Sequence, residues 1–523
     1  MNGQYQDLNR LLADLKRGRK PGEVGQLPDA HFELPSNIAA TQSMQFNLNG
    51  NPEGKIFLGA LGGQVVKGDR LPDGRPTRYV QGGIPIGYLD DRHIVLVAGS
   101  RGSKGRAILL PNLYFLPPTT SLLCVDPKGD HARETLRYRA EILGQRIVGL
   151  LDPFGVCGPG LEKYKVVFNV IEILMRSDRR TLVPNAKLIA DALIVAGDFK
   201  DKHWDITSQH ILAGLCIHVA LHERYEGHRN LVTVYYLVSE LSVTDPDNPN
   251  HCWLELEMLA NDAASGFVRN TARAFYSRTS GEYSSVLSNL RKHVEWIGIE
   301  CMAECLVGKS IDLRNFKLDS MALYASVPAM RMNDLKGWLR LLTQMTLAAH
   351  EEVPTTNRYR QTILMLDEFS ILGRMSCLEV GAAQLAGLGA KILAVVQDLG
   401  QIRSKFTDSW ETFIGNAGML IFFSLADSMS LQYVSKRLGL TSCLSRSTNL
   451  PTFEQASRNA ATGESWSIST QPLMTPEEIC RYFARDDFLL RQLILRPGYK
   501  PAILQRIYYD RHAWLKDKID AIT

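Results

Sequence analysis

The sequence predicts an α/β fold with a mostly parallel sheet that is interrupted by an all-α inserted domain. Short apolar runs between helical stretches, such as "HIVLVAG" and "TSLLCVDPKGD", are typical of buried strands joined by crossover helices. Residues 171–310 instead hold long amphipathic segments such as "TSQHILAGLCIHVALHERY". Strand-like runs return after this stretch, so the sheet is expected to stop and resume around it.

Composition places the chain among ordinary globular proteins and gives no direct sign of a charged partner. Of 523 residues, 45% are hydrophobic and 22% charged, with a net charge of +4. That excess is too small to indicate nucleic-acid binding by itself, so any DNA contact must come from a local patch or a ring of subunits.

The cysteines and the apolar runs predict a cytoplasmic protein. Nine cysteines are scattered, which fits a reducing compartment, and only Cys301 and Cys305 lie close together. Without a second pair or a histidine at ligand spacing, a zinc site is not expected. The N-terminus has no signal-peptide core, and no window reaches about 18 consecutive apolar residues, so no membrane span is expected.

Four segments are expected along the chain. They are an N-terminal helix and irregular arm (1–54), the first part of the α/β domain (55–170), the all-α inserted domain (171–310), and the second part of the α/β domain with C-terminal strands (311–523). Leucines at helical spacing predict a basic helix over 1–18. Such a helix could contact a phosphate backbone or a partner, or be a plain solvated helix.

Within the second and fourth segments the strands are expected in order. Short strands with turns fill 55–90, and the crossover strands are "HIVLVAG", "TSLLCV", "QRIVGLLDPFG", "MALYASVP", "TILMLDEFS", "AKILAVVQD" and "GMLIFFSLAD". Residues 444–470 are polar with few apolar anchors and are predicted to be a mobile loop. The last 50 residues predict a closing strand pair.

The stretch "IVLVAGSRGSKGRA" (94–107) resembles the start of a phosphate-binding loop but departs from its usual pattern. If Lys104 is the phosphate lysine, the pattern G-x-x-x-x-G-K-[ST] expects glycines where Ala98 and Ser103 stand. It also expects a hydroxyl residue where Gly105 stands. Taken alone, the stretch is a nucleotide site, a nucleotide site that has lost its function, or an ordinary glycine loop.

A pair of carboxylates ends a later buried strand. Asp367 and Glu368 follow "TILML", and burying two carboxylates is costly unless they are paired or bind a metal. In a nucleotide site, Asp367 would hold Mg²⁺ and Glu368 would polarise the water that attacks the γ-phosphate. The alternative is a helix whose first turn carries acidic residues.

Together the two sites favour a RecA-like P-loop core that binds ATP and Mg²⁺. Backbone N–H groups at the start of a helix would cradle the phosphates, and Lys104 would reach the β and γ oxygens. The residues predicted to bind the nucleotide are Gly99, Ser100, Arg101, Gly102, Ser103, Lys104, Gly105 and Arg106.

Two further strand ends carry polar side chains. Gln397 ends the strand after the acidic pair and could sense the γ-phosphate and orient the water, although polar residues at strand ends are common. Asp126 ends the strand "TSLLCV" and could place the water or tie the nucleotide loop down. The alternative for Asp126 is a plain P-K-G-D turn.

These stretches together resemble the TraG/TraD-type conjugative coupling ATPases of type IV secretion. Some members read A-G-S-R-A-G-K-G-R-S in the nucleotide loop, so Gly105 is usual for the family and the departure is reduced to Gly102–Ser103. The resemblance covers roughly 55–515. Its other matching stretches are "LPNL", "VDPKGD", "SSVLSNL", "WLRLLTQM", "LMLDEFSILGRMSCLEVGAAQLAGLGAKILAVVQDLGQI", "NAGMLIFF", "PLMTPEEI" and "YYD".

The resemblance implies a hexameric ring that translocates single- or double-stranded DNA with ATP and Mg²⁺. It implies Lys104 as the phosphate lysine, Asp367 as the Mg²⁺ residue, Glu368 as the catalytic base and Gln397 as the γ-phosphate sensor. Arg374 and Arg403 are candidates for an arginine supplied by a neighbouring subunit.

Two departures from the family shape the expected function. Most members begin with membrane helices and this sequence shows none, so membrane contact is expected only through another protein. A side chain at Ser103 crowds the turn that meets the phosphates, so hydrolysis is expected to be slow or to need assembly.

The expected function is an ATP-driven DNA or nucleoprotein translocase. The alternatives are an adaptor that holds nucleotide with little hydrolysis and recruits a relaxase or effector, and a nucleic-acid defence component encoded on a mobile element.

Overall fold

The structure is a computed structural model that describes residues 29–70, 74, 76–195, 202–354, 361–375, 385–406, 410–449 and 463–521. The helix predicted over 1–18 lies outside the described residues. In the part of the chain that is described, no helix combines the length and the apolar character that crossing a membrane requires.

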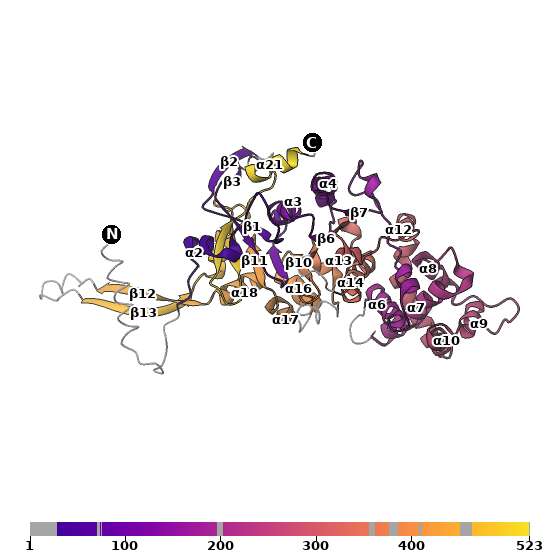
Figure 1. The fold of residues 1–523 in the computed structure, drawn as a ribbon. Coiled ribbons are helices and arrows are strands. Elements are labelled where there is room, and N and C mark those ends of the chain that lie inside the picture. The colour runs from indigo at the N-terminus through magenta and orange to yellow at the C-terminus, as the bar shows by residue number, and fades with distance from the viewer. Residues whose placement is uncertain are drawn as a thin grey trace.

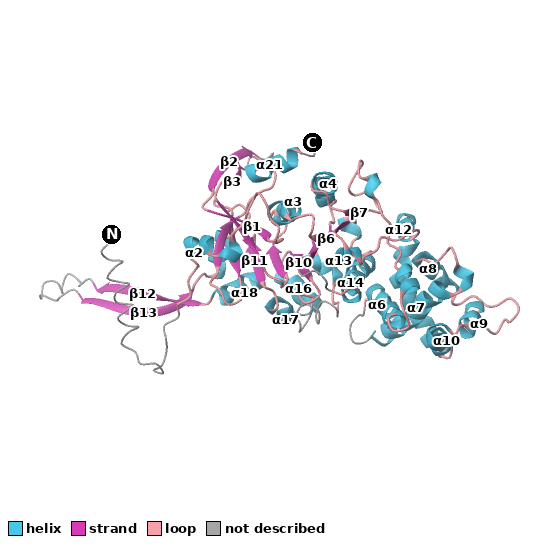
Figure 2. Cartoon of the chain, in the orientation of Figure 1, coloured by secondary structure: helices cyan, strands magenta, loops and turns pink. Residues whose placement is uncertain are grey.

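One large sheet forms the centre of the molecule (Figure 2). Among the described residues it has eleven strands in the order β4-β1-β15-β14-β11-β5-β10-β9-β6-β8-β7. The strands are β1 (Ile56–Leu61), β4 (Ile84–Tyr88), β5 (Ile94–Ala98), β6 (Ser121–Val125), β7 (Ile147–Leu151), β8 (Met321–Ala325), β9 (Thr362–Leu366), β10 (Ala390–Val396), β11 (Met419–Phe423), β14 (Arg491–Leu495) and β15 (Ala502–Gln505).

The run from β11 to β7 is entirely parallel, and the other four strands add to it antiparallel. The predicted fold class, a RecA-like α/β core with a mostly parallel sheet, is confirmed. The predicted closing strand pair is also present, as β14 and β15.

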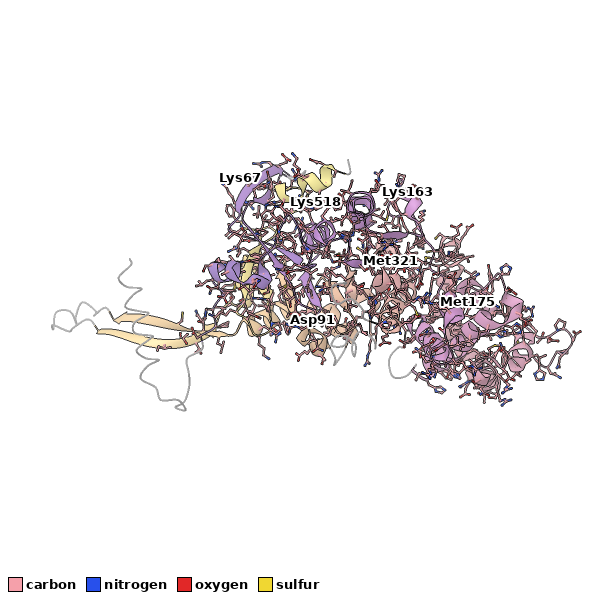
Figure 3. The ribbon with its side chains drawn as sticks, in the orientation of Figure 1. Lys67, Asp91, Lys163, Met175, Met321 and Lys518 are labelled. Atoms are coloured by element: carbon pink, nitrogen blue, oxygen red, sulfur yellow. The ribbon has the colours of Figure 1, made fainter. Side chains whose placement is uncertain are left out.

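Both faces of the sheet are covered by helices, which explains why the crossover strands are apolar at most positions. In β5, Val95 and Val97 pack with α14 (Lys336–Glu352), α16 (Leu399–Phe406) and α18 (Ser428–Leu438). The alternate residues Ile94, Leu96 and Ala98 pack with α3 (Leu110–Phe115) and α4 (Asp130–Arg137) on the other face. Figure 3 shows Met321, the first residue of β8, deep within this packing.

Between β7 and β8 the chain leaves the sheet and forms a cluster of helices at one end of the molecule (Figure 1). The long helix α7 lies at its centre and packs against α5, α6, α8, α10 and α11. The helices are α5 (Ile171–Arg176), α6 (Leu182–Leu193), α7 (Lys202–Leu221), α8 (Leu231–Glu240), α9 (Trp253–Ala260), α10 (Ala263–Tyr276), α11 (Ser280–Val294) and α12 (Glu300–Leu306). We call this cluster the helical insertion.

The loop predicted over 444–470 is wrong for residues 444–449 and 463–470, which are strands, while residues 450–462 lie outside the described part of the chain. Strands β12 (Leu440–Asn449) and β13 (Gly463–Pro472) pair antiparallel and form a ribbon that projects from the body in Figure 1. The sequence "LSRSTN" and "SWSIST" alternates hydroxyl residues with others, and a ribbon satisfies its backbone through the ladder without needing apolar anchors. The low hydrophobicity of this segment is therefore the reason why its strands were not predicted from the sequence.

Smaller elements complete the chain. Strands β2 (Gln64–Arg70) and β3 (Pro76–Gln81) form a second two-stranded sheet. The remaining helices are α2 (Pro35–Ala40), α13 (Asn315–Leu318), α17 (Trp410–Gly415), α20 (Pro476–Tyr482) and α21 (Ala513–Asp520), with short 3-10 turns between the elements.

Lys391 is a buried cation in β10, at the edge of the sheet where the parallel strands begin, and it predicts a pH effect on stability. Its side chain is 3% exposed and its Nζ donates to the carbonyl oxygen of Asp90 at 3.2 Å. Burial lowers the pKa of Lys391 to about 8, against the partial opposing effect of Asp90 and Asp91. The folded state therefore binds fewer protons than the unfolded state between about pH 8 and 10.4, and stability rises with pH there.

Lys391→Met is expected to stabilise the protein by about 2 kcal/mol at pH 7, because the cost of the buried charge disappears while the side-chain volume is kept. The gain in Tm over the wild type should shrink as the pH rises from 7 to 10. A gain in Tm that is the same at both values would contradict the assignment of this effect to the charge.

Candidate functional site

Three loops with polar side chains meet at one edge of the sheet. Strands β5, β10 and β9 are parallel neighbours with β10 in the middle, so their carboxyl ends lie side by side. Residues 99–104 follow β5, Asp367 and Glu368 follow β9, and Gln397 follows β10. In open α/β sheets this edge is where ligands bind.

Lys104 lies between the two carboxylates. Its Nζ is 3.3 Å from Asp367 Oδ1 and 3.6 Å from Glu368 Oε2. The Nε2 of Gln397 donates to the same Glu368 oxygen at 3.0 Å. The structure thus brings together the residues that the sequence analysis assigned to the phosphate, metal, base and sensor roles. With the lysine paired in this way, the four side chains carry one net negative charge.

Close approach of the backbone explains two glycines of the nucleotide loop. A Cβ on Gly99 would overlap the carbonyl oxygen of Ser424, and one on Gly102 would lie 2.8 Å from the carbonyl oxygen of Gly99. The Gly102 N–H also donates to the Gly99 carbonyl at 2.9 Å, which closes the turn. Ser424 follows β11, so the loop is wedged against the neighbouring strand end.

Ser103 adopts the backbone conformation that favours glycine. Its φ is +68°, and Arg101 in the same loop has a φ of +56°. A left-handed residue with a side chain costs about 1–2 kcal/mol. Of the departures from the usual loop pattern, Ser103 therefore falls at a position where glycine would remove strain.

Ser103→Gly is expected to tighten ATP binding about fivefold, which corresponds to about 1 kcal/mol, because the phosphate-binding conformation of the loop no longer carries the strain. A titration with a fluorescent ATP analogue measures this. Ser100→Gly is the matched control, since Ser100 in the same loop has no positive φ. Equal tightening in both variants would show general loop flexibility instead.

The nucleotide loop leads directly into a helix. Residues Gly105–Leu109 form a π-helical turn that continues into α3, and the Leu110 N–H donates to the Gly105 carbonyl. Pro111 has no N–H to donate, which makes an irregular turn less costly here. The first N–H groups of this helix have no partner within it, so its start is suited to bind an anion.

Gly105 lies against a histidine that the sequence analysis missed. A Cβ on Gly105 would be 3.3 Å from His131 Nε2. The Ser or Thr side chain that the usual loop pattern has at this position would therefore lie against the imidazole ring. Asp126 Oδ1 lies 3.4 Å from His131 Nδ1, and Asp126 Oδ2 accepts the Ala132 N–H at 3.0 Å. Asp126 thus holds the start of α4 and the ring next to the nucleotide loop. The only sequence signal for His131 was its position directly after "VDPKGD".

The Arg106 side chain binds the C-terminal segment. Its Nε and Nη2 donate to the two carboxylate oxygens of Asp510 at 2.5 and 2.6 Å, and its guanidinium lies 4.4 Å from the centre of the Tyr508 ring. The Arg106 carbonyl oxygen also accepts the Tyr509 N–H at 3.2 Å, and these contacts explain why "YYD" accompanies the loop.

The carboxylates fit a Mg²⁺ ion bound together with a nucleotide. Within the described residues, Asp367 Oδ1 is buried and has no hydrogen-bond partner, although the Lys104 ammonium is nearby. No cluster of three or more possible metal ligands occurs in the described part of the chain. A single carboxylate with phosphate oxygens and waters is the usual environment of Mg²⁺.

Glu368 is held in an uncommon conformation. Its φ is +71°, and its Oε1 accepts the Ser370 hydroxyl at 3.2 Å while Oε2 accepts Gln397. Left-handed residues other than glycine concentrate at functional sites. Of the two candidate arginines for a neighbouring site, Arg403 lies exposed on α16, and the Arg374 carbonyl accepts a hydrogen bond from Arg340.

Comparison with known proteins gives matches along most of the chain. The sequence model of the family described as "Type IV secretory system Conjugative DNA transfer" matches residues 62–521. The type IV secretion system-coupling protein VirD4 of Bartonella quintana is 24% identical over 488 residues, which are 87% of this chain and 71% of that protein. The conjugal transfer protein TraG of Rhizobium radiobacter is 23% identical over 420 residues, 79% of this chain and 61% of that protein.

Solved structures of a plasmid coupling protein, TrwB, share the fold. The complex of TrwB with ADP and Mg²⁺ superposes with a TM-score of 0.59 at 13% identity, over 92% of this chain and 97% of that one. An unbound form of TrwB gives a TM-score of 0.59 at 14% identity, over 81% and 87%.

Proposed function

The chain belongs to the type IV secretory system family for conjugative DNA transfer, and we propose that it hydrolyses ATP to move DNA or nucleoprotein through a ring of its own copies. The observation that carries the proposal is the meeting of Lys104, Asp367, Glu368 and Gln397 at one edge of the sheet. These are the side chains that phosphoryl transfer needs for phosphate binding, metal binding and placement of a water.

Each residue has a task in the proposed reaction. Lys104 exchanges its carboxylate partners for β- and γ-phosphate oxygens, and the backbone N–H groups of 99–105 bind the same phosphates. When bound, Mg²⁺ neutralises charge on the phosphates, and Asp367 would hold it. Glu368, released from Lys104, accepts the proton of the attacking water, and Gln397 orients that water through its amide.

A ring of subunits fits the chemistry proposed for the site. Phosphoryl transfer in this class gains from an arginine that stabilises the charge of the transition state, and a neighbouring subunit can supply it. Arg374 and Arg403 remain our candidates, within a homo-oligomer proposed to be a hexamer. The substrate is DNA or nucleoprotein, and the protein is proposed to be cytoplasmic and recruited to the inner membrane by a partner protein. We assign residues 171–310 as an inserted domain that selects the substrate.

Two measurements test the proposal. ATP turnover is measured with and without DNA, and the mass in solution is measured with and without an ATP analogue and DNA. Turnover that DNA stimulates, together with nucleotide-dependent assembly to about six subunits, is expected. DNA binding should also weaken steeply with salt.

A second candidate function is an adaptor that binds nucleotide with little hydrolysis and recruits a relaxase or effector. The strained Ser103 in the nucleotide loop favours it. ATP binding without turnover under every condition would support the adaptor and reject the motor.

A further inference from the structure

Arg340 is a buried cation between the helical insertion and the loop that follows the acidic pair. It lies on α14 and is 2% exposed. Its guanidinium donates to four backbone carbonyl oxygens. Nε donates to Ala192 at 3.0 Å and Nη2 to Asp191 at 3.3 Å, while Nη1 donates to Leu372 at 2.7 Å and to Arg374 at 2.6 Å.

The four carbonyls belong to two separate segments of the chain, one at the end of α6 and one at the end of a short 3-10 turn. Asp191 and Ala192 lie in the last turn of α6, where carbonyls have no partner within the helix and carry the negative end of its dipole. Leu372 ends the 3-10 turn η8 (Phe369–Leu372), and Arg374 follows it by two residues. One guanidinium therefore joins the helical insertion to the segment that begins directly after Glu368.

A second set of contacts fixes the insertion side of this junction. Gln344, one turn after Arg340 on α14, donates to Asp191 Oδ2 at 3.3 Å. Gln209 on α7 donates to Asp191 Oδ1 at 3.3 Å and to the Ile194 carbonyl at 3.1 Å. These contacts connect α7 to the end of α6, and the end of α6 to α14.

The other side of the junction leads to the acidic pair. The short turn η8 connects Leu372 back to Glu368, and Ser370 within it donates its hydroxyl to Glu368 Oε1 at 3.2 Å. Gly373 has a φ of +62°, so the chain turns sharply between the two carbonyls that Arg340 binds. Moving those carbonyls moves the turn that holds the carboxylate.

We propose that Arg340 is a positioning residue through which the helical insertion sets the placement of Glu368. When the insertion engages its substrate and α6 shifts, the guanidinium transmits the shift to residues 369–374. This coupling rests on the proposed function for its effect on hydrolysis, but the mechanical link itself does not require turnover.

Hydrogen exchange tests the link in the full-length chain. Arg340→Lys cannot keep four donors in a planar fork, so amide protection at 190–194 and at 369–374 is expected to fall together. Arg139→Lys is the matched control. Arg139 is also fully buried and donates to the carbonyls of Leu113, Leu116 and Pro117, away from the insertion. Equal loss at 369–374 in both variants would overturn the proposal.

A variant that touches neither α14 nor η8 keeps the test independent of the fold around Arg340. Gln209→Ala removes donors from α7 to the end of α6 and is expected to raise exchange at 369–374. Unchanged exchange in that segment, with a normal Tm, would overturn the proposal.

The effect on hydrolysis separates positioning from general damage. Arg340→Lys is expected to lower kcat about tenfold or more while KM for ATP stays within about twofold of the wild type, because misplacing a catalytic group costs rate and leaves nucleotide contacts in place. A parallel loss in kcat and ATP affinity would count against it. A wild-type chain without turnover would reject the proposed function and leave the exchange test to decide this inference.

Discussion

Replacing Glu368 with glutamine is expected to lower kcat for ATP hydrolysis by about 10²–10⁴-fold and to leave ATP bound as tightly as before or more tightly. An amide of the same size cannot accept the proton of the attacking water. Lys104 also loses a carboxylate 3.6 Å from its Nζ, so its ammonium is freer to meet the phosphates. Single-turnover hydrolysis and an equilibrium titration with nucleotide measure the two effects separately.

Two companion variants sharpen this experiment. Glu300→Gln is the matched control, because Glu300 is an exposed carboxylate in α12 of the helical insertion. Asp367→Asn should instead raise the Mg²⁺ concentration that hydrolysis requires. If the wild type turns over ATP no faster than Glu368→Gln under all conditions, Glu368 is not a catalytic base. The result would then favour the adaptor function over the motor function.

Replacing Gly99 with alanine is expected to weaken nucleotide binding by up to about 10²-fold, because forcing an extra methyl group into a filled space costs about 1–3 kcal/mol. The added Cβ would overlap the Ser424 carbonyl oxygen. Because both atoms are attached directly to the backbone, the overlap can be relieved only by moving the nucleotide loop or the end of β11. Titration with a fluorescent ATP analogue gives the affinity, and the Tm reports whether the fold is kept.

Gly415→Ala is the control for the general effect of a methyl group. Gly415 ends α17, and an added Cβ there meets no atom within 4 Å. Wild-type affinity in a folded Gly99→Ala protein would mean that the loop moves on binding to a conformation in which Gly99 and Ser424 are apart.

Local patterns in the sequence were sufficient to predict the sheet and the principal residues of the candidate site. Buried parallel strands are apolar along their whole length, and polar residues at their carboxyl ends must meet at one edge. Asp367, Glu368 and Gln397 therefore came from strand ends, and Lys104 came from the glycine loop that follows one of them. Their distances show that they meet, while their roles in hydrolysis stay predictions.

Other features depend on contacts between distant segments, which no local pattern reveals. Arg340 resembles any arginine of an amphipathic helix until α6 and η8 are placed against it. The pairing of Arg106 with Asp510 joins residues 404 positions apart. The ribbon over β12 and β13 was missed for a different reason, because the backbone ladder and not apolar burial holds such a pair together.

The pairing of Lys104 with both carboxylates has a consequence for how a nucleotide binds to the site. The ammonium lies beside both carboxylates and compensates one of their two negative charges. A phosphate that takes Lys104 leaves Asp367 and Glu368 without this counter-charge. In the proposed reaction, phosphate binding by Lys104 and cation binding by Asp367 therefore favour each other.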